Sequence, residues 1–96
     1  MKIPKKIKIM GHKYKVKKDK KIFIETNYGG GSACANALVI KVSPDVPESR
    51  QAEILLHEII EMLKYSLQVQ LEHKDLSALS EGLFSVIRDN KLDFRK

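Results

Sequence analysis

The feature that most constrains the fold is a change in the spacing of apolar residues along the chain. Near the N-terminus apolar residues alternate with lysines, as in Ile7 and Ile9 against Lys6 and Lys8. A period of two is the pattern of a strand with one buried face and one solvated face. From residue 52 onward apolar residues recur every three or four positions, which is the period of an amphipathic helix. Strands followed by helices predict an α+β domain.

We expect a small, mostly antiparallel sheet of about four strands within residues 1–42. Met10 and Gly11 separate the two lysine-rich runs, and glycine readily adopts the positive φ that a hairpin turn requires. In the second run Tyr14 and Val16 are predicted to face the core. The alternating positions, Lys13, Lys15 and Lys17, are predicted to face solvent.

Two further strands are expected before the helices. Residues 21–28, KIFIETNY, contain β-branched and aromatic residues and predict the third strand. Residues 29–32, GGGS, are expected to form a turn, and residues 36–42, NALVIKV, the fourth strand. In that strand Leu38, Ile40 and Val42 are predicted to share one face.

Two helices are expected, at about residues 47–67 and about residues 74–89. Asp45 is expected near the N-cap of the first helix, with Pro47 in its first turn. Asn90 is a candidate left-handed C-cap for the second helix. The stripe of the first helix predicted to face the sheet consists of Ala52, Leu55, Leu56, Ile59, Ile60, Leu63 and Leu67.

The net charge of +6 is concentrated in one segment. Residues 1–21 contain ten lysines and one acid, Asp19, whereas residues 22–96 contain eight basic and eleven acidic residues. The plain interpretation is a solvated strand face that discourages edge-to-edge pairing. The alternative is attraction of a polyanion such as nucleic acid or an acidic membrane surface. Because residues 1–21 contain no arginine, we expect no sequence-specific nucleic-acid binding.

The size and composition indicate a single cytoplasmic domain, residues 1–96. Of the residues, 43% are hydrophobic and 31% are charged, and no apolar run is long enough to span a bilayer, so we expect no membrane partner. The single cysteine, Cys34, cannot form an internal disulfide or a thiolate cluster. A metal site would therefore use histidine and carboxylate ligands.

The first helix carries a candidate metal-binding pattern in residues 55–65, LLHEIIEMLKY. His57 and Glu61 are one turn apart, about 40° from each other around the helix, so both could bind one ion. Glu58 lies about 100° from His57, beside such a site. A third ligand is needed, and His73 is the candidate, since an antiparallel helix hairpin would return it to the pair.

These residues permit two interpretations. Two imidazoles and one carboxylate with an open position are a known ligand set for catalytic zinc. The alternative is that His57, Glu58 and Glu61 are the polar face of an amphipathic helix, with His73 solvated or at a helix cap. Spacing and composition alone favour the polar face, because a His-Glu pair on a helix is common.

A resemblance favours the metal site. From YGGGSACANALVIKV through the helix pattern to the Asp-Asn at residues 89–90, the chain resembles a family of small phage and prophage proteins related to zincin-like metallopeptidases. The resemblance implies a minimal zincin-like fold in which residues 1–42 form the sheet. It also implies that His57, Glu61 and His73 bind Zn²⁺ or another divalent metal, and that Glu58 is the catalytic base.

The resemblance further implies hydrolysis of peptide bonds through a metal-bound water, with a peptide or protein as substrate. Tyr65 occupies a position where such sequences often have tyrosine, which would make it an accessory residue, although a partly buried helix aromatic is the plainer interpretation. Whether the chain is an enzyme stays open at this point. The rival functions are a non-catalytic interaction domain with a vestigial or structural metal site, and non-specific nucleic-acid binding by the lysine-rich strands.

Overall fold

The computed structural model describes residues 3–22 and 30–90. Within these ranges a four-stranded mixed sheet is followed by two helices, which confirms the predicted α+β fold. The elements are β1 (Lys6–Ile9), β2 (His12–Lys18), β3 (Gly31–Cys34), β4 (Val39–Val42), α2 (Glu48–Leu67) and α3 (His73–Asn90).

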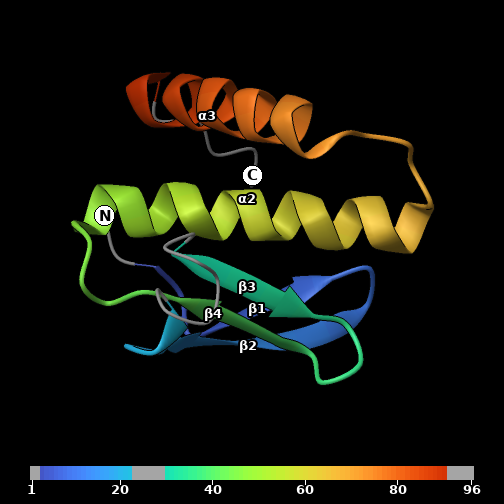
Figure 1. Cartoon of the computed structure of the whole chain (residues 1–96), viewed down its shortest axis with the longest axis horizontal. Helices are drawn as coiled ribbons and strands as arrows, with labels where there is room; N and C mark the ends of the chain where they lie inside the picture. The colour runs from blue at the N-terminus through green and yellow to red at the C-terminus, as the bar shows by residue number, and fades with distance from the viewer. Residues whose placement is uncertain (1–2, 23–29, 91–96) are drawn as a thin grey trace.

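The elements form three layers, with α2 in the middle. One side of α2 packs on β1, β3 and β4, and α3 packs antiparallel on its other side (Figure 1). No helix of the described residues is sufficiently long and apolar to cross a bilayer. Helix α2 therefore has two faces to bury, one against the sheet and one against α3.

The sheet has the strand order β1-β2-β4-β3. The β1–β2 and β3–β4 pairs are antiparallel, whereas β2 and β4 run parallel. The predicted hairpin is confirmed, because Met10 and Gly11 both have positive φ, 50° and 85°, between β1 and β2. Two consecutive residues with positive φ match the right-handed twist of the flanking strands.

The alternation predicted for β2 is also confirmed. Tyr14 and Val16 are buried, while the three intervening lysines are exposed. Their buried neighbours in the sheet core include Ile40 and Val42 of β4, which are fully buried. One face of the sheet therefore packs under α2, and the other face carries the lysines.

The turn predicted at residues 29–32 and the predicted start of the fourth strand at residue 36 were wrong. Residues 31–34 form β3, although residues 29–32 were predicted as a turn, and the fourth strand begins at residue 39. The turn lies nearer the C-terminus because Leu38 has a φ of 53° and its N–H donates to the carbonyl of Ala35. Leu38 thus precedes the strand, although it still packs against the core. The strand predicted at residues 21–28 falls almost wholly outside the described residues.

Gly31 pairs with Val42 in the sheet, and α2 packs closely on it. A Cβ at this position would collide with the side chain of Ile54 and would lie 3.3 Å from Oε2 of Glu58. The sequence GGGS suggests flexibility, but at Gly31 the missing side chain serves close packing. This contact places Glu58 against the edge strand of the sheet.

The N-terminal end of α2 differs from the expected cap, and its C-terminal end closes through a left-handed residue. Pro47 is the N-cap and makes no side-chain cap, while the N–H of Asp45 donates to Oγ of Ser43. Gln68 adopts a left-handed conformation at the C-terminal end, and the following N–H, of Val69, donates to the carbonyl of Lys64. This arrangement ends the helix without glycine or proline and starts the return to α3.

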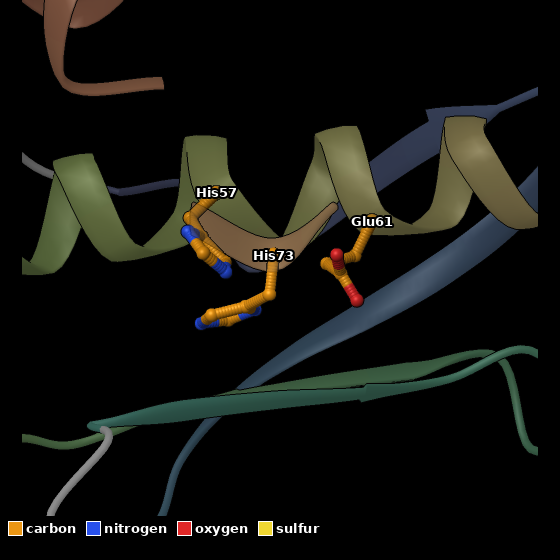
Figure 2. A group of neighbouring side chains, drawn as sticks. All are labelled: His57, Glu61 and His73. Carbon is orange, nitrogen blue, oxygen red and sulfur yellow. The ribbon is translucent and has the colours of Figure 1, made fainter. Parts of the chain in front are cut away.

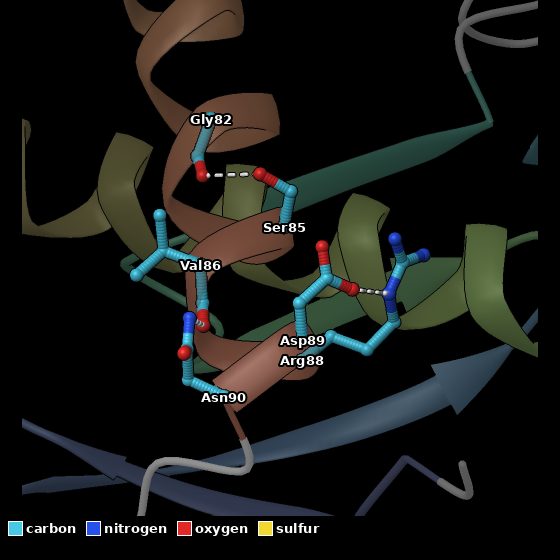
Figure 3. Close-up of polar contacts among 6 residues, drawn as sticks. All are labelled: Gly82, Ser85, Val86, Arg88, Asp89 and Asn90. Carbon is cyan, nitrogen blue, oxygen red and sulfur yellow. Dashed lines mark hydrogen bonds and ion pairs between the residues drawn. The ribbon is translucent and has the colours of Figure 1, made fainter.

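Helix α3 begins at His73 and ends at Asn90, one residue beyond the prediction at each end. The predicted left-handed cap at Asn90 was wrong, since the only non-glycine residues with positive φ in the described ranges are Met10, Leu38 and Gln68. The Asn90 side chain instead donates to the carbonyl of Val86, one turn back (Figure 3).

The apolar stripe predicted for α2 divides between its two packed faces. Leu55 belongs to the sheet core and Ile59 packs against it, whereas Leu56 and Ile60 are half-buried and lie outside that cluster. Leu67 is 55% exposed. The sheet core also contains two residues that the predicted stripe omitted, Ile54 and Met62. A single stripe was the wrong description because α2 packs against two layers.

Two glycine substitutions test the close packing at Gly31. We expect Gly31→Ala to lower the free energy of unfolding by roughly 1–3 kcal/mol, because the added methyl displaces buried Ile54. Gly82→Ala is the control, because a Cβ there meets nothing within 4 Å in the interior of α3. It should raise the stability by up to about 1 kcal/mol. Urea unfolding of both variants measures the difference, and equal stabilities would contradict the packing argument.

Candidate metal centre

The helix hairpin brings His57, Glu61 and His73 together. His57 and Glu61 lie one turn apart on α2 and are half-buried, and His73 is the exposed first residue of α3. One potential ligand atom from each side chain lies within 4.8 Å of the other two. The side chains gather in one space beside α2 (Figure 2). The predicted convergence of the three residues is therefore confirmed.

The geometry of the two imidazoles suits ligation of a common ion. The ring centroids of His57 and His73 are 5.2 Å apart, and the ring planes are inclined by 64°. The rings meet edge to face and are not stacked, so nitrogens of both can be directed at one point between them. Burial lowers the pKa of His57 below its ordinary value, and the neighbouring His73 lowers it further. This favours the neutral imidazole that binds a metal.

Glu61 supplies an independent indication of a missing partner. Its Oε1 atom is buried and has no hydrogen-bond partner among the described residues. A buried carboxylate oxygen without a partner is costly, and a cation is one of the groups that satisfies it. Two imidazole nitrogens and one carboxylate oxygen are a donor set typical of zinc with an open position. The residues present therefore fit a divalent metal of this kind.

Glu58 lies beside the cluster, as the helix projection predicted. It points toward β3, where Gly31 leaves room for its carboxyl group. Burial, together with the smaller effect of the negative charge of Glu61, raises the pKa of Glu58 to about 7. A carboxyl group with a pKa near neutrality can accept and release a proton under physiological conditions. A cation bound at the neighbouring cluster would lower this pKa again.

The cluster opens into a polar pocket of about 370 Å³ between α2, α3 and β3. At one end Arg50 donates to Glu53 at 2.6 Å, and both side chains face the pocket. Glu58 and two of the three cluster residues also line it. Its complete lining is Gly31, Arg50, Glu53, Ile54, His57, Glu58, His73, Ser77, Ser80 and Glu81.

Some of these pocket residues were missed in the sequence. Ser77 and Glu81 follow His73 at intervals of four, so helical periodicity places them on one face of α3. That spacing could have identified them once His73 was considered as a ligand. Gly31 could not have been identified in this way, because its role depends on how closely α2 approaches the sheet.

Tyr65 does not join the candidate centre. It is 65% exposed, so the expectation of a partly buried aromatic was wrong. It lies with Glu61 along a separate shallow hollow near the end of α2, and it does not line the polar pocket. The accessory role suggested for Tyr65 has no support in this geometry.

Comparisons of the chain with protein-family models, curated proteins and solved structures found no match. The functional argument therefore rests on the site and on the sequence pattern.

The raised pKa of Glu58 predicts a pH-dependent stability in metal-free protein. The folded pKa of about 7 lies above the ordinary value of 4.5. Folded protein consequently binds more protons than the unfolded chain between these values, and the free energy of unfolding falls as pH rises through this window. Glutamine does not ionise, so Glu58→Gln should not lose stability as the pH rises. At about pH 8 its free energy of unfolding should exceed that of the parent by up to about 3 kcal/mol.

The measurement is urea unfolding with a chelator present, at about pH 4.5 and about pH 8. Parent and Glu58→Gln should differ little at the lower pH. Glu81→Gln is the matched control, because Glu81 is an exposed glutamate of the same pocket and its replacement should change stability little at either pH. A Glu58→Gln variant that gains no stability over the parent at the higher pH would contradict the assigned pKa.

Proposed function

We propose that this protein is a zinc-dependent hydrolase of peptide bonds. The observation that carries the proposal is the convergence of His57, Glu61 and His73 beside the buried carboxyl group of Glu58. Two helices supply the three candidate ligands, and the pocket gives a substrate access to them. The peptide substrate is supported by the resemblance to zincin-like metallopeptidases described above.

The residues would divide the chemical work. His57, Glu61 and His73 would hold the ion, which when bound would supply Lewis acidity for a water molecule and a substrate carbonyl. Glu58 would accept a proton from the attacking water and deliver it to the leaving amine. The partial burial of Glu58 keeps its basicity high, because burial disfavours the ionised carboxylate.

The first test separates ligands from base by zinc titration. His57→Ala, Glu61→Ala and His73→Ala should each weaken zinc binding by more than about 100-fold, because even residues outside the ligand shell can affect affinity roughly 10–100-fold. Glu58→Gln should retain zinc and lower peptide hydrolysis by roughly 10²–10⁴-fold, the usual contribution of a general base. Isothermal titration measures binding, and a quenched fluorescent peptide library measures hydrolysis.

His12→Ala is the matched control for the histidine variants. His12 is exposed at the start of β2 and does not belong to the cluster, so its loss should leave zinc affinity unchanged. Equal zinc affinity in the parent and Glu61→Ala would remove Glu61 from the site. Loss of zinc in Glu58→Gln alone would reverse the roles assigned to the two glutamates.

A structural metal in a non-catalytic interaction domain is the second candidate function. In favour of it, α3 makes its main contacts with α2 alone, so an ion bound by His73 would hold the hairpin together. The outer side of α3 also exposes three apolar residues at helical spacing, which a protein partner could cover. They are Leu79, Leu83 and Val86, exposed by 60%, 47% and 49%.

Thermal unfolding and peptide hydrolysis together distinguish the two candidates. Zinc at about 100 times its dissociation constant should stabilise the parent by about 2.7 kcal/mol, because it binds the folded chain. His73→Ala should lose this stabilisation, whereas the control His12→Ala should keep it. Zinc-dependent stabilisation without detectable hydrolysis would favour the structural metal, while stabilisation with hydrolysis that requires Glu58 would favour the enzyme.

A further inference from the structure

The solvent-facing side of the sheet carries lysines in directly opposed pairs. Lys6 pairs with Lys15, and Lys8 with Lys13, between β1 and β2. A third pair joins β2 to β4 and consists of Lys17 and Lys41. The residues that alternate with these lysines along each strand face α2. The six lysines therefore lie together on the other face of the sheet. We refer to Lys6, Lys8, Lys13, Lys15, Lys17 and Lys41 as the lysine face.

This arrangement is unfavourable for the folded protein by itself. Side chains directly opposite each other on neighbouring strands have Cβ atoms about 5 Å apart, and like charges at that separation destabilise a sheet. Asp19 lies 3.5 Å from Lys41, but no other ion pair among the described residues involves the lysine face. Acidic and basic residues in opposed positions would keep this face of the sheet equally well hydrated without the repulsion. The uniform sign therefore indicates a ligand of opposite charge.

The charges of the molecule are separated by layer. The four strands contain seven lysines and no aspartate or glutamate. Helices α2 and α3 together contain seven acidic residues and four lysines or arginines. A polyanion would thus be attracted to the sheet layer and repelled by the helical layers, which orients it on the lysine face.

We propose that the lysine face binds the phosphate backbone of a double-stranded nucleic acid, independently of sequence. Lys13 and Lys17 are four strand residues apart, which corresponds to about 13 Å along β2. Duplex DNA carries one charge per about 1.7 Å of its axis, so roughly eight phosphates occupy the same length. The lysine face presents six lysines to them on the sheet, of which, among the described residues, only Lys41 has an acidic ion-pair partner, Asp19.

The residues around these lysines favour a duplex over other polyanions. Single-strand binders stack bases on exposed aromatic side chains, but Tyr14 is buried under α2 and His12 shares its side of β2, so no aromatic ring of the four strands lies on the lysine face. Membrane-surface binding usually adds buried apolar area to charge, and the outer side of the described strands offers only Val39 and the small side chain of Cys34. No arginine, asparagine or glutamine occurs in the four strands, so the planar side chains that read guanine and adenine edges are absent from them.

The proposal does not depend on the hydrolase proposed above. The candidate metal centre lies on the α2 side of the sheet, whereas the lysine face lies on the other side. Duplex binding should therefore proceed without zinc, and His57→Ala should bind duplex as the parent does. Loss of hydrolysis and loss of duplex binding would arise from different variants.

The test is fluorescence anisotropy with a short, mixed-sequence DNA duplex and the metal-free full chain. Between about 50 and 200 mM salt, log affinity should fall linearly with log salt, with a slope of roughly −4. In the double variant Lys13→Gln, Lys15→Gln the slope should shrink by about 2. The affinity of this variant at the lower salt should fall by at least about 30-fold.

Lys64→Gln, Lys74→Gln is the control, because it removes the same charge from the helical layers. It should weaken binding by less than about 3-fold, since long-range attraction alone is lost. The face variant should unfold at the same temperature as the parent or a higher one, because it removes repulsion between opposed lysines. A loss of binding therefore cannot be attributed to unfolding.

Three further probes complete the experiment. A duplex of another sequence and an RNA duplex should bind within about tenfold of the first, because the phosphate backbone is the ligand. Vesicles of equimolar phosphatidylcholine and phosphatidylserine should compete poorly. Equal losses in the two double variants, no detectable duplex binding, or vesicles that outcompete the duplex would each overturn the proposal.

Discussion

The structure depends on one helix that is packed on two sides. Helix α2 covers the sheet with one face and holds α3 on another, and the candidate metal centre lies where these two faces meet. His57 and Glu61 occupy that border, so they are half-buried and neither enclosed in a core nor fully solvated. The border between the two packed faces supplies the polar pocket into which the cluster opens.

The approach of α2 to β3 connects this packing to acid–base chemistry. Because Gly31 has no side chain, α2 lies closer to β3 than any other residue at this position would permit. The carboxyl group of Glu58 consequently lies against the sheet. Reduced contact with water is the main cause of the raised pKa of Glu58, and Glu61 contributes a second, smaller effect. A backbone feature outside the helix thus adjusts the protonation of a side chain on it. The same packing excludes larger residues from position 31, whatever the protein does.

Sequence periodicity predicted the fold and the cluster well because both depend on local repeats. The period-two run located β1 and β2, and the separation of four residues placed His57 and Glu61 on one side of α2. The positions of β3 and β4 were not predictable from the same rules. Leu38 adopts a left-handed conformation that leucine rarely takes, and Gly31 lies in a strand at a close contact with a distant helix. Non-local contacts also explain the divided apolar stripe of α2, since the sequence does not reveal that α3 packs on its second side.

The parallel pairing of β2 with β4 has a consequence for how the chain folds. The β1–β2 hairpin and the α2–α3 hairpin are both local, whereas Lys15 and Val39 are neighbours across 24 positions of the chain. Closing such a loop costs chain entropy before the contacts it permits are made. Proteins with more distant contacts fold more slowly, so joining the two halves of the sheet is expected to limit the folding rate. Because α2 packs on strands from both halves, its sheet-facing side is expected to become buried only after this slow step.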